Sequence, residues 1–174
     1  MAKQLNLAGF KREKDNFGGS LLKNSNAKTK RPLESKLPIH LVLRSKKGVM
    51  RLPKTLRHVN QIVGSTAKKH GVTIYRYANV GNHLHMVIKI PARTRWSAFI
   101  RELTGRIAHK MHGFKKSEEN FWLQRPFTRV IRGWRKAFQT ALRYVELNQL
   151  EADGFISRKD TKTLKDLRAI WQDG

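Results

Sequence analysis

The sequence predicts an α+β domain in which one antiparallel sheet carries helices packed mainly on one face. Three observations lead to this prediction. Segments rich in β-branched and aromatic residues alternate with longer segments whose apolar residues recur every three or four positions. The chain has 174 residues, which is enough for one domain with its own hydrophobic core. It contains no cysteine, so a disulfide framework, a cysteine-based zinc site and a cysteine nucleophile are excluded.

The first part of the chain divides into a tail and a strand. Residues 1–35 mix Gly, Ser, Asn and Lys with little periodicity. We expect them to form a basic, flexible tail, which either contacts nucleic acid or is simply solvated. Residues 38–45 are predicted as a strand, because Ile39, Leu41 and Leu43 alternate with the side chains of the other face.

A helix and a hairpin follow. Residues 52–71 are predicted as a helix, with Pro53 in its first turn and Gly71 at its end. Residues 72–80 are rich in β-branched and aromatic residues, and residues 83–90 are mostly apolar, so both segments are predicted as strands. The Gly-Asn pair between them is typical of a tight turn, which makes the two strands antiparallel neighbours.

The second half of the chain adds a helix, a strand and a helix. These are predicted over residues 94–113, 127–131 and 134–150. The order strand, helix, strand, strand, helix, strand, helix matches the split βαβ pattern of ferredoxin-like folds, written βαββαβα. We therefore expect one domain over residues 36–155 and a C-terminal extension over 156–174 that contains a short helix.

The charge of the chain indicates a polyanionic partner. Lys and Arg number 37 against 12 Asp and Glu, for a formal net charge of +25. Nucleic acid is favoured over a membrane, because no apolar run is long enough to span a bilayer and no basic helix has a strongly apolar, aromatic face. The basic side chains expected to contact DNA phosphates are Arg44, Lys46, Lys47, Arg51, Arg101, Arg106 and Lys110.

Two histidines are the main candidates for binding a metal. Residues 33–117 contain only Glu34 and Glu102 as acids, so they cannot supply an acidic two-metal cluster. His83 and His85 are two positions apart in a predicted strand, so their side chains share the face opposite the apolar core face. Two imidazoles at this spacing can bind one metal ion. They can also be two histidines on a sheet face without any ligand.

Tyr144 and Asn148 form a second pair, in the third predicted helix. They are four residues apart and therefore neighbours on one helix face, at the border of its apolar stripe. A phenol in this place can act as a nucleophile that forms a covalent intermediate. The alternative is an amphipathic tyrosine that covers the edge of the core.

Three segments together resemble a known family. The stretch GNHLHMVIKI is similar to a Pro-Asn-His-x-His-hydrophobic motif. The stretches FWLQRPFTRVIRGW and YVELNQLEADGF are similar to a Trp-Gln-Arg segment and to a Tyr-Ile-x-x-Asn-Pro helix end. Over residues 36–155 the chain resembles the HUH single-tyrosine transposases, and among them the REP-associated tyrosine transposases of the IS200-like family. It departs from these motifs at Gly81 and Gln149, where proline is usual, and Glu146 places a negative charge beside the tyrosine.

The resemblance implies a cytoplasmic bacterial enzyme that cuts and rejoins single-stranded or hairpin DNA. Tyr144 would be the nucleophile and would form a 5′-phosphotyrosine intermediate. His83, His85 and Asn148 would hold a divalent metal, Mg²⁺ or Mn²⁺. The enzyme would work without a membrane, as a monomer or as a homodimer.

Two other classes of protein compete with this interpretation. A non-catalytic basic nucleic-acid-binding protein, such as a domesticated transposase or a chaperone, would explain the charge. It would not explain why two histidines, a tyrosine and an asparagine occur together. A structural zinc domain is disfavoured because cysteine is absent and because His40, His109 and His112 suggest no closed set of ligands.

Overall fold

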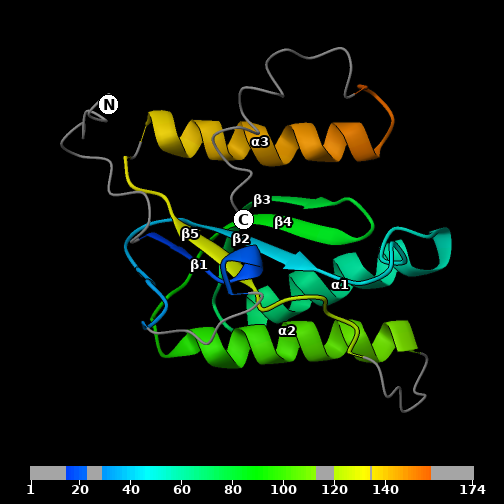
Figure 1. Ribbon diagram of the computed structural model, residues 1–174, viewed down its shortest axis with the longest axis horizontal. Helices are drawn as coiled ribbons and strands as arrows, with labels where there is room; N and C mark the ends of the chain where they lie inside the picture. The colour runs from blue at the N-terminus through cyan, green and yellow to red at the C-terminus, as the bar shows by residue number, and fades with distance from the viewer. Residues whose placement is uncertain (1–14, 23–28, 113–119, 134, 158–174) are drawn as a thin grey trace, which may run out of the picture.

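The computed structural model describes residues 15–22, 29–112, 120–133 and 135–157. Within them, a five-stranded antiparallel sheet lies between α3 on one side and α1 and α2 on the other (Figure 1). The strands are β1 (Asn16–Phe17), β2 (Ile39–Arg44), β3 (Thr73–Asn79), β4 (His83–Lys89) and β5 (Phe127–Val130). The helices are α1 (Pro53–Lys69), α2 (Arg95–His112) and α3 (Lys136–Ala152), with a short 3₁₀ helix, η2 (Gly19–Leu22).

The strand order in the sheet is β1-β5-β2-β4-β3. The two central strands are β2 and β4, and Leu41 of β2 pairs with Met86 of β4 on one side and with Thr128 of β5 on the other. From β2 to α3 the elements follow the predicted βαββαβα order. The α+β, ferredoxin-like prediction is therefore confirmed, and β1 is an additional strand at the edge.

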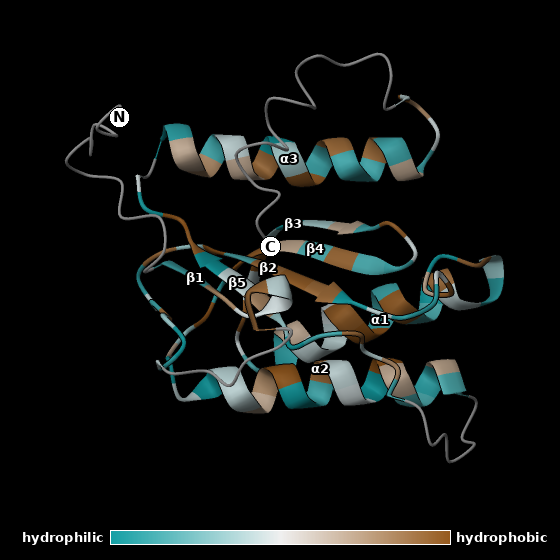
Figure 2. Cartoon of the chain, viewed as in Figure 1, coloured by the Kyte–Doolittle hydropathy of each residue, from teal (hydrophilic) through white to brown (hydrophobic). Residues whose placement is uncertain are grey.

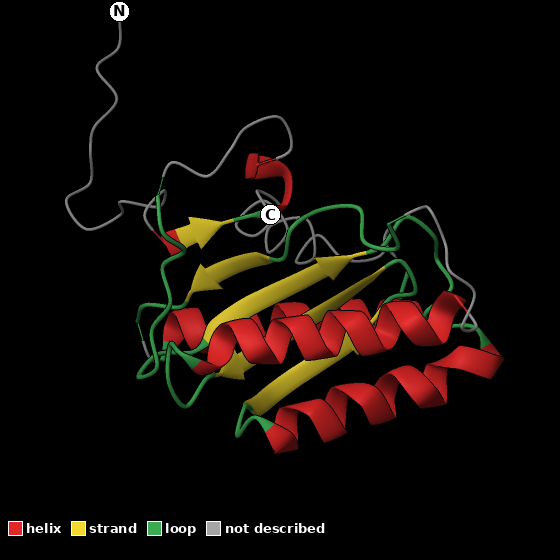
Figure 3. Ribbon diagram, turned by 90° about the horizontal axis from the view of Figure 1, so that it is seen from below, coloured by secondary structure: helices red, strands yellow, loops and turns green. Residues whose placement is uncertain are grey.

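The main core lies between the sheet and the two helices α1 and α2. Because side chains alternate along a strand, every second residue of β2 and β4 enters this core. The apolar strand residues in it are Ile39, Leu41, Leu43, Leu84, Met86 and Ile88. The helices contribute Val59, Ile62 and Val63 from α1 and Phe99, Leu103 and Ile107 from α2. These helices lie side by side in front of the sheet when it is seen from below (Figure 3).

The α3 helix packs on the opposite face, against β3 and β4. A smaller apolar cluster fills this layer, with Ala141 and Val145 from α3 and Ala78 and Val87 from the two strands. Hydrophobic and hydrophilic residues alternate along α3, as expected for an amphipathic helix (Figure 2). Two of the three helices thus share one face, as predicted, while the third covers the face that carries the histidines.

Part of the segment predicted as a flexible tail belongs to the sheet, which corrects that prediction. In β1, Asn16 pairs with Arg129 and Phe17 pairs with Thr128. Arg31 secures this edge, because its guanidinium donates to the carbonyl oxygen of Pro126 at 2.8 Å and to the Thr128 hydroxyl at 2.7 Å. Burial, with a smaller effect of a nearby arginine, lowers the pKa of Arg31 to about 10. A two-residue strand has too little periodicity to be predicted.

The predicted C-terminal helix lies outside the described residues, since the structure describes nothing beyond residue 157. In the part of the chain that is described, none of the helices is both long and apolar enough to cross a membrane.

Candidate active site at the histidine face of the sheet

Three histidines meet on the face of the sheet that α3 covers. Val42 of β2 pairs with His85 of β4. Because alternate residues share a face, His40 of β2 lies on the same face as His83 and His85. The ring centroids of His83 and His85 are 4.6 Å apart, and those of His40 and His85 are 5.6 Å apart. The alternation in β4 predicts the first pair, whereas His40 joins it only through the pairing of β2 with β4.

The α3 helix places Tyr144 against these histidines. Its ring centroid is 5.5 Å from that of His85 and 5.7 Å from that of His40, and the ring planes meet at 82° and 86°. The side chain of Tyr144 is buried, with 6% of its surface exposed. The structure therefore brings the predicted tyrosine and the predicted histidines together within one chain.

Asn148 lies one helical turn after Tyr144 and is also buried. Its Nδ2 donates a hydrogen bond to the backbone carbonyl oxygen of Tyr144 at 2.7 Å. Because the amide nitrogen bonds to the helix, Oδ1 is the atom by which this side chain could bind a metal. The predicted pair of Tyr144 and Asn148 thus shares one buried helix face.

The two histidines of the strand each contact a polar neighbour through Nδ1. His83 Nδ1 lies 2.6 Å from Oδ1 of Asn82, and His85 Nδ1 lies 3.4 Å from Nε2 of His40. An amide oxygen only accepts hydrogen bonds, so His83 donates from Nδ1, and the neutral form of this ring has its lone pair on Nε2. Nε2 is then the nitrogen by which His83 would bind a metal.

The donor atoms at this site suit a divalent cation. Two imidazole nitrogens and one amide oxygen are ligands that favour Mn²⁺ or a similar ion, while Mg²⁺ prefers a set made of oxygen alone. Within the described ranges, no group of three or more His, Cys, Asp or Glu side chains is placed to hold a metal ion. A metal bound by His83 and His85 would therefore depend on Asn148, or on oxygen atoms of water and substrate, to complete its ligands.

A family comparison covers the whole of this site. The family described as "Transposase IS200 like" matches residues 34–148, which extend from before β2 to Asn148. The chain belongs to the IS200-like transposase family. No curated protein sequence is a significant match to it.

Two solved transposase structures resemble this chain to different extents. A REP-associated tyrosine transposase bound to a REP hairpin superposes with a TM-score of 0.61 at 14% identity, over 75% of this chain and 76% of that one. A Deinococcus radiodurans protein assigned as a transposase has a TM-score of 0.46 at 18% identity, over 71% of this chain and 98% of that one. At 14% identity the likeness to the first of these structures shows the fold, and membership in the IS200-like transposase family supports a transposase function.

The predicted DNA-binding residues of this IS200-like transposase divide between the two faces of the sheet. Arg44 is exposed and pairs with His83 across β2 and β4, and the exposed Lys46 and Lys47 follow it in the chain. The basic residues of α2 lie in the helical layer on the opposite face. Among these, Arg106 donates to the hydroxyls of Ser65 and Thr66 at 3.1 and 2.9 Å, so it joins α2 to α1. Arg101 and Lys110 are exposed on the same helix.

Arg51 contributes to a clamp at the end of α3, a role that the sequence does not predict. Its guanidinium forms an ion pair with Asp153 and donates to the carbonyl oxygen of Asn79 at 3.1 Å. Gln149 accepts a hydrogen bond from the Asn79 amide at 3.0 Å and donates to Asp153 at 2.9 Å. The hydrogen bonds from Gln149 and Arg51 hold the pKa of Asp153 below its usual value. We call these four residues the α3 clamp, because they tie α3 to the end of β3.

Gly81 forms the turn before His83 in a conformation that proline cannot adopt. Its φ is +95°, whereas the proline ring holds φ near −65°. The amide of Gly81 donates to Oδ1 of Asn79 at 3.0 Å, and its carbonyl oxygen accepts a hydrogen bond from the Met50 amide at 3.1 Å. These bonds fix the point at which β4 and its histidines begin.

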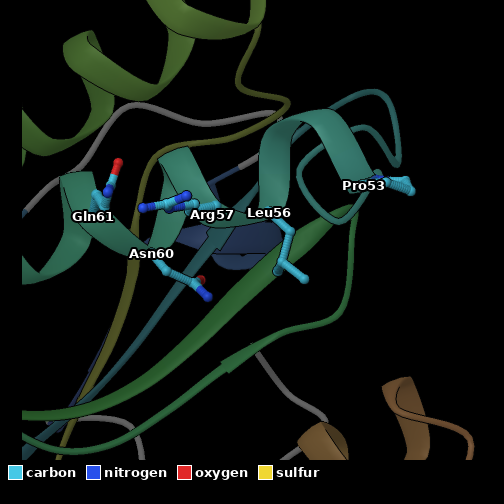
Figure 4. Close-up of a pocket in the computed structure, with 5 residues that line it drawn as sticks. All are labelled: Pro53, Leu56, Arg57, Asn60 and Gln61. Atoms are coloured by element: carbon cyan, nitrogen blue, oxygen red, sulfur yellow. The ribbon is translucent and has the colours of Figure 1, made fainter.

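An open surface pocket of about 500 Å³ lies elsewhere, beside α1. It is lined by Pro53, Leu56, Arg57, Asn60 and Gln61 (Figure 4). None of these side chains belongs to the histidine face, so the candidate active site is not this pocket.

Proposed function

We propose that this IS200-like transposase cuts and rejoins single-stranded or hairpin DNA, with Tyr144 as the nucleophile. The observation that carries the proposal is the contact of the Tyr144 ring with His85, beside His83, inside one chain. Two adjacent imidazoles next to a buried phenol are suited to phosphoryl transfer through a covalent enzyme intermediate.

The reaction exchanges one phosphodiester bond for another. The Tyr144 oxygen loses its proton to solvent and bonds to phosphorus, and the bond from phosphorus to the 3′ oxygen breaks. That oxygen takes up a proton and leaves as a 3′-hydroxyl, so the DNA remains attached through a 5′-phosphotyrosine. The new ester keeps the energy of the old one, and a 3′-hydroxyl of another strand can reverse the step without ATP.

His83, His85 and Asn148 would hold the divalent metal, Mg²⁺ or Mn²⁺, that members of this family use. When bound, a divalent cation withdraws charge from a phosphate oxygen, which favours attack by an anionic phenolate. The role of this chain is to fix the ligands. Asn82 orients the His83 ring through Nδ1, and the α3 helix holds Asn148 one turn from the nucleophile.

Arg44, Lys46 and Lys47 would bind the DNA backbone at the edge of the histidine face. Arg44 lies opposite His83 in the sheet, so its charge can neutralise a phosphate close to the reacting one. The related transposase structure with a bound REP hairpin supports hairpin DNA as the partner. Since the Tyr144 ring lies next to His85 of its own chain, the proposed site would be completed within one protomer.

The proposal is tested by trapping the covalent intermediate. The protein is incubated with labelled hairpin-containing single-stranded DNA and Mn²⁺ or Mg²⁺, and adducts are resolved on a denaturing gel. Wild-type protein should give an adduct, Tyr144→Phe should give none while still binding DNA, and Tyr75→Phe should behave as wild type. The same amount of adduct from Tyr144→Phe as from wild type would exclude Tyr144 as the nucleophile. Tight DNA binding without any adduct would favour the non-catalytic binding protein.

A mixing experiment tests whether one protomer is sufficient. Tyr144→Phe is combined with the double variant His83→Ala, His85→Ala. If each site is completed within one chain, the mixture forms no adduct. Recovery of adduct in the mixture would show that the tyrosine acts on the histidines of a second copy.

A further inference from the structure

The histidine face carries an arginine that is not among the predicted DNA-binding residues. Arg129 of β5 pairs with His40 of β2, and the side chains of paired residues lie on the same face of a sheet. Arg129 therefore lies on the face of His83 and His85, with a partly exposed side chain. After burial, its charge is the second cause that lowers the pKa of His40, as expected for a guanidinium on this side of the sheet.

We propose that Arg129 binds a DNA phosphate that neighbours the reacting one, so that the strand crosses the histidine face from Arg44 on β2 to Arg129 on β5. This inference rests on the proposed function, since it requires DNA at the histidine face. Arg129 contacts the backbone of the substrate and takes no part in breaking or forming bonds.

The spacing of the two arginines suits a short stretch of single strand. Arg44 is in the same row of the sheet as His83, Arg129 is two rows further on, and His85 lies in the row between. The Cα atoms of Arg44 and Arg129 are thus about 14 Å apart, four residues of about 3.3 Å along the sheet and one strand spacing of about 4.8 Å across. One DNA strand carries a phosphate about every 3.4 Å of axis in the B form, and more widely when it is extended. The two arginines therefore span a few phosphates, with the proposed metal ligands at the level between them.

The position of α3 favours a path towards β5. The helix packs against β3 and β4, and the sheet order places β2 and then β5 on the other side of β4. A strand that continued towards β3 would have to enter the layer that α3 fills with apolar side chains, among them Ala78, Ala141 and Val145. A strand that turns towards β5 does not cross this layer. The packing of α3 thus directs the DNA from the histidines towards Arg129.

Arg76 of β3 occupies the matching position at the other side of the sheet. His40 pairs with Val87 of β4, and Val87 pairs with Arg76, so Arg76 and Arg129 belong to one row of the histidine face. Nη1 of Arg76 is 3.8 Å from Oε1 of Glu146 on α3. The carboxylate of Glu146 would repel a phosphate at Arg76, because like charges disfavour each other at short range. Arg76 is therefore a matched control: the same residue type in the same row, with surroundings that disfavour DNA.

An arginine in this place can hold a phosphate whatever the base that the nucleotide carries. Its planar guanidinium can donate two parallel hydrogen bonds to phosphate oxygens, and it stays charged at physiological pH. A neighbouring phosphate that is held in this way limits how far the reacting phosphorus can move relative to Tyr144. Such positioning favours the attack, because part of the entropic cost is met when the DNA binds.

The experiment compares Arg129→Gln, Arg129→Lys and Arg76→Gln. Binding of a fluorescein-labelled oligothymidylate is measured by anisotropy over a salt series without metal, and thermal unfolding shows that each variant is folded. We expect Arg129→Gln to weaken binding and to reduce the slope of log K against log salt by about 0.7, the value for one phosphate of a single strand. Arg129→Lys keeps the charge and should keep the slope, and Arg76→Gln should behave as wild type. A folded Arg129→Gln protein with the wild-type slope, or an equal loss of slope in Arg76→Gln, would overturn the inference.

A second measurement needs no variant. The Nε–H signal of Arg129 is followed by NMR in the wild-type protein while the same oligothymidylate is added. We expect this signal to shift as the DNA binds and the Arg76 signal to stay in place. An Arg129 signal that does not move while the protein binds DNA would overturn the inference even if Arg129→Gln fails to fold. If the wild-type protein forms no adduct with any metal, the proposed function fails, while these binding measurements still decide the role of Arg129.

Discussion

Gln149 accepts a hydrogen bond from the backbone amide of Asn79 at 3.0 Å, and this bond joins the end of α3 to the end of β3. The motif that the chain resembles has proline at this position, which could not make the bond. Gln149 also donates to Asp153, whose carboxylate is paired with Arg51. The departure from the motif thus has a structural role, because the α3 clamp fixes the helix that carries Tyr144.

Substitution of Gln149 should loosen α3. Gln149→Ala removes both hydrogen bonds, and we expect it to lower the free energy of unfolding by about 1–2 kcal/mol. It should also slow adduct formation more than it weakens DNA binding, because the nucleophile is less well placed. Chemical denaturation and the adduct assay measure these effects. Gln139→Ala, at an exposed glutamine of the same helix, is the matched control, and equal behaviour of the two variants would argue against the clamp.

The clamp should also make stability depend on pH. Hydrogen bonds from Gln149 and Arg51 hold the pKa of Asp153 below its usual 3.8. Its folded-state pKa is therefore lower than its unfolded one, so its contribution to stability is present above about pH 4 and is lost as pH falls through the folded-state pKa. Wild type should be more stable than Asp153→Asn at pH 7 and at pH 5, with the difference shrinking towards pH 3. A difference that stays constant from pH 7 to pH 3 would contradict this reading.

The turn at Gly81 should not tolerate the proline of the related motif. Gly81→Pro places a ring restricted to φ near −65° where the backbone has φ +95°, and it removes the hydrogen bond from the Gly81 amide to Asn79. We expect a loss of about 3 kcal/mol or more in the free energy of unfolding, measured by urea denaturation. Gly105→Ala provides the contrast, because a Cβ at this exposed site in α2 meets nothing within 4 Å. It should stabilise the protein by about 0.5–1 kcal/mol. Wild-type stability in Gly81→Pro would show that the turn can be rebuilt.

Arginines on the two faces of the sheet should differ in their effect on DNA binding. Arg44→Ala should weaken hairpin binding and reduce the slope of log K against log salt by about 1, because one phosphate contact is lost. Arg106→Ala should mainly lower thermal stability, since Arg106 bonds to Ser65 and Thr66. Fluorescence anisotropy over a salt series measures both slopes. A larger loss of affinity in Arg106→Ala than in Arg44→Ala would indicate that DNA binds on the side of α1 and α2.

The parts of the fold and site that follow local patterns could be predicted from the sequence. Alternation in β4 predicts that His83 and His85 share a face, and the helical repeat predicts that Tyr144 and Asn148 are neighbours. Both predictions concern residues a few positions apart, where backbone geometry alone decides the arrangement. The position of Tyr144 against the histidines was expected from the family resemblance, and the structure has this contact.

The remaining features depend on pairings between distant segments. His40 reaches the site because β2 pairs with β4, and no local pattern in β2 distinguishes it from a surface histidine. The sequence suggests Arg51 as a DNA contact, but in the structure Arg51 forms an ion pair with Asp153, which lies far along the chain. The strand β1 has two residues, too few for any periodicity. The periodicity of a strand or helix predicts on which face a residue lies, but it does not predict which other segment packs against that face.

The most direct test of the central claim is the identification of the residue that carries DNA. The covalent adduct formed with hairpin DNA is digested with protease and nuclease, and mass spectrometry locates the attached nucleotide. We expect one modified peptide, with the nucleotide phosphate on Tyr144. Attachment to Tyr75, to Tyr77 or to any residue other than Tyr144 would contradict it.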